Sequence, residues 1–147
     1  MRDDHKDILS RFLKIAILPR YSDRFIAKQA SLSEFLDHKF AIGVDPSRVL
    51  NIPHAVSLRP LTLFSQLANK LPLVRVGRGA SNRMTSVQEA MEEYCGQCVL
   101  LVFNNGQCAF FENEAGPDAV HWIIFANDSE AKRVKTVLQS LARPQND

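Results

Sequence analysis

The fold is decided by the stretch Cys98-Val-Leu-Leu-Val-Phe-Asn-Asn-Gly-Gln-Cys-Ala-Phe-Phe-Glu112. Two apolar runs flank Asn105-Gly106, and Asn-Gly between β-branched and aromatic residues is the strongest short-range signal for a β-hairpin. Both central positions of a type I′ turn require a positive φ, which Asn and Gly adopt more readily than other residues. The sequence therefore predicts antiparallel strands near 98–103 and 107–112.

A two-residue loop at Asn105-Gly106 also fixes which residues face each other across the hairpin. The predicted pairs are Phe103 with Cys108, Leu101 with Phe110, Val99 with Glu112 and Leu100 with Phe111. Both faces of this hairpin are apolar, and the run 120–126 after Gly116-Pro117-Asp118 adds a third strand without polar alternation over 122–126. Strands of this kind lie in sheets covered on both sides. We therefore expect a three-stranded meander between two layers of helices.

Outside the meander, helical spacing of apolar residues, capping residues and proline positions predict the other elements. Helices are expected over 3–18, 22–30, 32–39, 61–70, 86–95 and from the cap at Asn127 to about 142. The first helix should bury one stripe, made of Ile8, Phe12, Ile15 and Ala16. A short strand is expected at 73–76, a loop at 77–83, and one or two extended pieces at a sheet edge within 47–60.

These elements predict a single α+β domain over residues 1–147. It divides into a mainly helical part (1–45), a mixed part (46–84) and a core of helix, three strands and helix (85–143). Roadblock, longin and profilin-like scaffolds and PAS-type sensor domains have a similar outline. This is a likeness of architecture without a shared motif, and it implies no function.

Composition fits an ordinary globular protein. The chain has 147 residues, 46% hydrophobic and 23% charged, and a net charge of +2 neither demands nor excludes a polyanionic partner. No apolar run approaches the ~20 residues of a membrane helix, and Asp3, Asp4 and Asp7 stand where an export signal would be basic. Three cysteines without an export signal favour reduced thiols, so we expect a soluble cytoplasmic protein.

The cysteines and one histidine are the candidate metal ligands. Cys95-Gly-Gln-Cys98 matches C-x-x-C, and Cys108 and His121 would complete a four-ligand zinc set. A two-residue hairpin loop places Cys98 and Cys108 on opposite faces, which argues against zinc, whereas a three-residue loop would bring them together. Thioredoxin-like chemistry is disfavoured because Cys95 closes a helix instead of starting one. We therefore expect these cysteines to be small buried apolar residues, with no metal and no cofactor.

The loop at 77–83 is the candidate anion site. It lies between an expected strand and a helix N-terminus, where backbone amides can hold an anion and Arg75, Arg78 and Arg83 could add charge. Its glycine spacing fits neither a Walker A loop nor the dinucleotide-binding pattern. A solvated basic loop is the simpler interpretation, and nucleic-acid or phosphate binding is kept as an alternative. The basic last helix, with Lys132, Arg133 and Lys135, would extend that surface.

No Ser, Cys or Thr stands in a nucleophile elbow or beside a recognisable base, so an enzyme is the less favoured interpretation. We expect an adaptor-like module without catalytic activity that binds another protein through a helix face or a free strand edge. Its partner could be a second copy in a homodimer. Nucleic-acid or phosphate binding is the first alternative, and a small-molecule sensor domain with a pocket between sheet and helices is the second.

Overall fold

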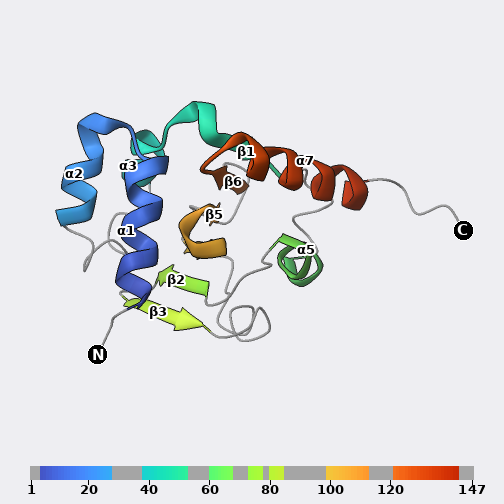
Figure 1. The fold of residues 1–147 in the computed structure, drawn as a ribbon, viewed down its shortest axis with the longest axis horizontal. Helices are drawn as coiled ribbons and strands as arrows, with labels where there is room; N and C mark the ends of the chain where they lie inside the picture. The colour runs from blue at the N-terminus through green and yellow to red at the C-terminus, as the bar shows by residue number, and fades with distance from the viewer. Residues whose placement is uncertain are drawn as a thin grey trace, which may run out of the picture.

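The computed structural model describes residues 4–27, 38–52, 60–67, 73–77, 80–84, 99–112 and 121–142. Figure 1 shows a sheet with α1, α2 and α3 on one side and α5 and α7 on the other. The α+β class predicted from the sequence is confirmed, as is the meander lying between helices. None of the described helices is long and apolar enough to cross a membrane.

Within the described residues the sheet contains six strands in the order β1-β6-β5-β4-β2-β3, and every neighbouring pair is antiparallel. The predicted meander is formed by β4 (Val99–Phe103), β5 (Cys108–Glu112) and β6 (His121–Phe125), which lie side by side at the centre. It is extended on one side by β2 (Leu73–Gly77) and β3 (Ala80–Met84), and on the other by β1 (Val49–Asn51). The sheet is therefore twice as wide as the predicted meander.

The hairpin between β4 and β5 follows the predicted register. Phe103 stands opposite Cys108 and Val99 opposite Glu112. Asn105 has φ 58° and ψ 35°, Gly106 has φ 85°, and the amide of Gln107 donates to the carbonyl of Asn104 at 3.1 Å. Positive φ at both central residues is the type I′ geometry that Asn-Gly predicted.

Both faces of β4 and β5 are buried, as their apolar composition predicted, whereas β6 buries Ile123 and Ile124 and leaves its other three residues half-buried. All five residues of β4 and all five of β5 are buried. On the α1 side, Leu100, Val102 and Phe111 pack with residues of α1 (Asp4–Ala16), α2 (Pro19–Ala27) and α3 (His38–Gly43). On the opposite side the sheet packs on α5 (Pro60–Leu67) and α7 (Asp128–Ala142). The two apolar clusters are separated by the sheet itself.

Three predictions need correction. The buried stripe of α1 includes Leu9 and Leu13, whereas Ile15 is only half-buried, because the helix packs on both the sheet and α2. The second helix begins at Pro19, since proline is favoured in the first turn of a helix as well as beyond its end. Residues 80–84 form β3 instead of a loop.

Other predictions fall partly outside the described residues. The helix expected at 86–95 lies outside them, as does most of the one expected at 32–39, although α3 follows at His38–Gly43. The helix expected at 61–70 is observed as α5, beginning at Pro60. The extended piece expected near a sheet edge is β1.

The N-terminus of α7 has the predicted cap. The side-chain oxygen of Asn127 accepts the amide of Glu130 at 2.9 Å, which satisfies one of the free N–H groups of the first turn. The helix buries Ala131, Val134 and Leu138, which recur on one face at helical spacing, and Val134 and Leu138 pack with residues of the sheet. Capping and burial together therefore fix both the start and the orientation of this helix.

Candidate functional site

The two described residues of the predicted zinc set do not meet. Cys108 begins β5 and pairs with Phe125, whereas His121 pairs with Glu112 at the other end of the same two strands. Cys95 and Cys98 lie outside the described residues. Burial raises the pKa of the Cys108 thiol far above its ordinary value, and the negative charge of Glu130 adds to the effect. Within the described part of the chain, no three His, Cys, Asp or Glu side chains could share a metal ion.

The arginines of the predicted anion site occupy different settings. Arg75 lies in the middle of β2, opposite Leu101, with only 4% of its surface exposed. Arg83 is in β3 opposite Val74, so it is not the register partner of Arg75, which stands opposite Asn82. Arg78 lies outside the described residues. Arg75 is therefore buried within a strand, on the same face of the sheet as Leu101, and is not part of a solvated loop.

The basic residues of α7 are also not equivalent. Lys132 and Lys135 are exposed, whereas Arg133 forms an ion pair with Glu130 at 2.8 Å, which raises the arginine's pKa. Glu130 in turn accepts a hydrogen bond from the buried Asn104 side chain at 3.1 Å, and the same Asn104 amide donates to the carbonyl of Leu67 at 3.1 Å. Arg133 and Glu130 thus join α7 to the hairpin loop and to α5.

A polar pair that sequence reasoning missed lies at the far end of the meander. The Nε2 atom of His121 is 3.1 Å from Oε1 of Glu112, whose side chain is 5% exposed, while that of His121 is 28% exposed. The register places both residues on the face that also carries Arg75 and Val99. This contact gives the buried carboxylate a hydrogen-bond partner and orients the imidazole. It accounts for two polar residues on a mainly apolar face.

A groove lined mainly by apolar residues lies at the β1 end of the sheet. Its volume is about 430 Å³, and we name it the β1 groove. The lining residues are Leu18, Ile42, Val44, Pro46, Val49, Asn51 and Trp122. Trp122 is the single tryptophan of the chain and is half-buried. Ile42 is 59% exposed and is the one large hydrophobic residue so exposed among the described residues.

Backbone contacts hold the walls of the β1 groove in place. The amide of Leu18 donates to the carbonyl of Gly43 at 2.8 Å, and the amide of Asp45 donates to that of Ala16 at 2.8 Å. Gly43 is tightly enclosed, because a Cβ atom there would lie 2.6 Å from the ring of Phe25. These contacts fix the α3 wall against the end of α1.

The short 3₁₀ helix η2 (Pro46–Arg48) leads from this wall into β1. Asp45 caps it, since its carboxylate accepts hydrogen bonds from the Ser47 hydroxyl at 2.8 Å and the Ser47 amide at 3.0 Å. Both contacts hold the pKa of Asp45 below its ordinary value. Arg48 forms an ion pair with Asp45 at 3.7 Å and donates to the carbonyl of Ala126, so the entry to β1 is tied to the end of β6.

The outer side of β1 carries main-chain groups that no described strand uses. The amide of Ile52 donates to the carbonyl of His121 at 2.9 Å, so hydrogen-bonded and non-bonded pairs alternate from that point along β1 and β6. The N–H and C=O groups of Val49 and Asn51 therefore point away from β6. Their side chains, two residues apart, both line the β1 groove.

No family model, curated protein or solved structure matches this chain.

Proposed function

We propose that this protein is a non-catalytic interaction module of the cytoplasm that docks another protein in the β1 groove. The observation that carries the proposal is an exposed apolar side chain, Ile42, in the lining of a groove that the half-buried Trp122 also lines. When a partner covers a large aliphatic side chain, the complex is stabilised by about 25 cal/mol for each Å² of apolar surface removed from water. Tryptophan is among the residues that contribute most to binding energy at protein interfaces.

The position of the groove supports a protein partner. It lies where an edge strand, the end of a helix and a proline-containing turn meet, so a partner would touch backbone and side chains from several segments. Bare strand edges pair readily with other chains. The backbone around the groove is already held by hydrogen bonds, so less conformational entropy is lost when a partner binds to its apolar lining.

The test is site-specific photo-cross-linking in cells that express the full chain from its natural source. A photoreactive phenylalanine analogue is placed at Ile42, and a matched chain carries it at Gln139, an exposed position on α7. We expect one protein to be captured from position 42 and not from position 139. Mass spectrometry of the cross-linked peptide then identifies the segment that enters the groove.

Three outcomes contradict this proposal or change the partner. Equal capture at both positions, or none at position 42, contradicts a docking role for the groove. Capture of the same chain makes the partner a second copy and establishes the homodimer. A small molecule retained in native mass spectrometry and lost on substitution of Trp122 assigns the groove, whose 430 Å³ lies in the range of ligand pockets, to a sensor domain.

A further inference from the structure

We propose a second binding surface for this protein, which lies on α1 and α2 and binds the phosphate backbone of a nucleic acid. We name it the α1–α2 basic surface, and it consists of Arg11, Lys14, Arg20 and Arg24. None of these residues lines the β1 groove, so this role goes beyond the docking role and does not depend on it. Three observations support it: the placement of the four cations, the lack of described acids paired with them, and the polar character of the surface around them.

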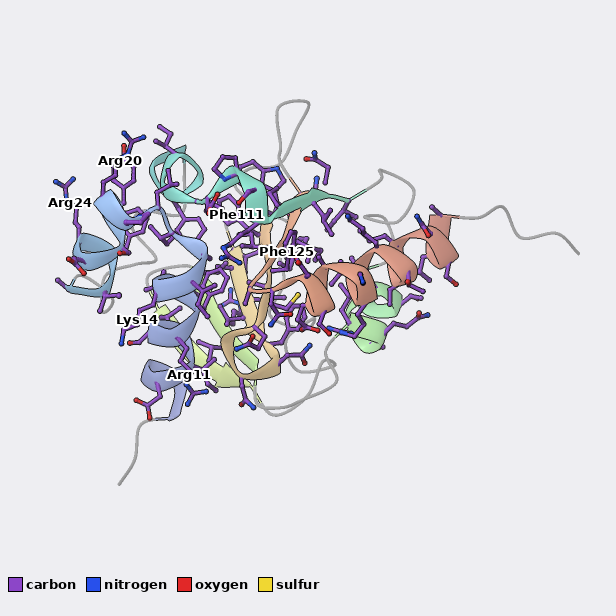
Figure 2. The ribbon with its side chains drawn as sticks, turned by 45° about the horizontal axis from the view of Figure 1, so that its top comes forward. Arg11, Lys14, Arg20, Arg24, Phe111 and Phe125 are labelled. Atoms are coloured by element: carbon purple, nitrogen blue, oxygen red, sulfur yellow. The ribbon has the colours of Figure 1, made fainter. Side chains whose placement is uncertain are left out.

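Both helices direct two basic side chains to solvent. Arg11 and Lys14 are three residues apart, so they lie on one face of α1. Arg20 and Arg24 are four residues apart and lie in the same way on one face of α2. All four are exposed, and the two helices pack against each other. Figure 2 shows the four on the side of the molecule away from the end of α7. The fold thus brings cations from two helices to one side of the protein.

The positive charge of this surface is not neutralised within the described structure. No acid among the described residues forms an ion pair with any of the four cations. Asp7 and Asp23 are the exposed acids among the described side chains of α1 and α2, so four positive charges stand against two negative ones. A surface with such an excess attracts anions and raises their local concentration.

Two of the arginines are already held in position. Nη1 of Arg11 donates to the carbonyl of Asn105 at 3.4 Å, and the guanidinium carbon of Arg20 lies 5.0 Å from the centre of the Tyr21 ring. A guanidinium carries five N–H donors, so these contacts leave donors that can pair with phosphate oxygens. Because the side chains are partly ordered beforehand, less conformational entropy is lost when a phosphate binds.

The composition of this surface favours a nucleic acid over a membrane or a protein. Its exposed residues between positions 7 and 27 include no large apolar side chain; they are Asp7, Arg11, Lys14, Pro19, Arg20, Asp23, Arg24 and Ala27. A helix that binds at a membrane surface inserts apolar side chains, and a protein interface has an apolar centre. Non-specific affinity for a nucleic-acid backbone comes instead from neutralisation of phosphates by lysine and arginine.

The first experiment measures binding of the full chain to labelled duplexes of DNA and of RNA by fluorescence anisotropy. Contacts with three or four phosphates predict a slope of about −3 for log K against log salt concentration. Affinity should therefore fall about 60-fold between about 50 mM and about 200 mM sodium chloride. A change of base sequence at constant length should leave the affinity unchanged, because phosphate contacts do not read bases. The duplex that binds more tightly identifies the source of the phosphate backbone.

Matched double substitutions test where the duplex binds. Arg20→Gln with Arg24→Gln removes two cations from the surface, and it should reduce the slope to about −1 and weaken binding at low salt by about tenfold or more. The control, Lys132→Gln with Lys135→Gln, makes the same change in net charge at exposed positions of α7. It should leave both the slope and the affinity unchanged. Circular dichroism spectra of both variants should match that of the original chain, because all four positions are exposed.

A substitution in the opposite direction should strengthen binding. Asp23 lies between Arg20 and Arg24 in the sequence of α2 and is exposed. Asp23→Asn removes a negative charge from the surface and should tighten duplex binding about threefold. The matched control Asp128→Asn, at an exposed position in the first turn of α7, should not change the affinity.

Several results would overturn this second role. They are the absence of duplex binding at low salt, a slope near zero, and equal losses in the two double variants. Tighter binding to vesicles of phosphatidylcholine and phosphatidylserine than to either duplex would assign the surface to a membrane instead of a nucleic acid. Capture from position 42 is measured separately and should be the same in both double variants, so the docking role and this role can fail independently.

Discussion

At the scale of single residues, the hairpin loop is constrained by both its backbone conformation and its contacts. Asn104, Asn105 and Gly106 all have positive φ, at 53°, 58° and 85°. A Cβ atom on Gly106 would lie 2.8 Å from the carbonyl oxygen of Ile8 and 3.2 Å from the amide nitrogen of Phe12. Gly106 is therefore required both by its backbone conformation and by its contact with α1.

Replacing Gly106 by alanine should lower the free energy of unfolding by about 1–3 kcal/mol, because alanine adds strain at this φ and a steric clash with α1. Denaturant unfolding followed by circular dichroism measures the change. The matched control is Asn105→Gly, at an exposed position of the same turn with φ 58°, which should change stability by less than about 0.5 kcal/mol. Equal losses in both variants would contradict this explanation.

The buried thiol of Cys108 should be unreactive in the folded protein. Only the thiolate reacts with alkylating reagents, and burial raises the pKa of this thiol so far that the thiolate does not form near neutrality. Iodoacetamide labelling at pH 7 and pH 9, followed by peptide mapping, should modify Cys108 only after denaturant is added. Labelling of Cys108 in native buffer that increases with pH would show that it is accessible.

At the scale of elements, α7 owes its starting point to one side chain. Asn127→Ala removes the acceptor for the Glu130 amide and should lower the free energy of unfolding by about 1 kcal/mol. The control Ser129→Ala changes an exposed residue of the first turn whose side chain is not the cap. Hydrogen exchange should be faster at the Glu130 amide in the first variant alone, and an unchanged rate there would contradict the role of the cap.

The elements also show which signals in the sequence were sufficient. The hairpin and α7 were predictable because Asn-Gly fixes a register and a cap residue fixes a start. Strand β3, Ala-Ser-Asn-Arg-Met, carries little apolar alternation, and it is held by pairing with β2. The sequence did contain one signal for this strand. Gly77 pairs with Ala80, and the two residues between them in the sequence, Arg78-Gly79, include a glycine, which is common in two-residue hairpin connections.

At the scale of the whole molecule, the sheet divides the interior into two separate apolar layers. Leu100 belongs to the layer on the α1 side and Leu101 to the layer beneath α5 and α7, and both are buried. Adjacent residues of one strand therefore report on different halves of the protein.

Leu100→Ala and Leu101→Ala should each lower the free energy of unfolding by about 2–5 kcal/mol, since each leaves a cavity in a filled layer. Thermal or denaturant unfolding of the two variants measures both losses. A smaller loss is expected for Leu141→Ala, near the end of α7, where the side chain is only half-buried. A negligible effect at either position 100 or 101 would mean that one face of the sheet is not covered.

The candidate site could not be read from the sequence in the same way. The β1 groove takes residues from the ends of α1 and α3, from η2, and from the strands β1 and β6, whose register with each other depends on the complete sheet. No local pattern links Leu18, Ile42 and Trp122. The sequence did predict an extended piece at a sheet edge, but not which side chains would surround it.

Among the strands that the structure describes, none pairs with the outer side of β1, and this has a consequence for the protein when it is produced alone. Main-chain groups at an unpaired strand edge can also pair with an unrelated strand and cause aggregation. Because β1 is only three residues long, few hydrogen bonds can form between two copies that associate in this way. Under the docking role proposed above, recombinant yield and colloidal behaviour should depend on the supply of the proposed partner, and co-production with that partner should raise both.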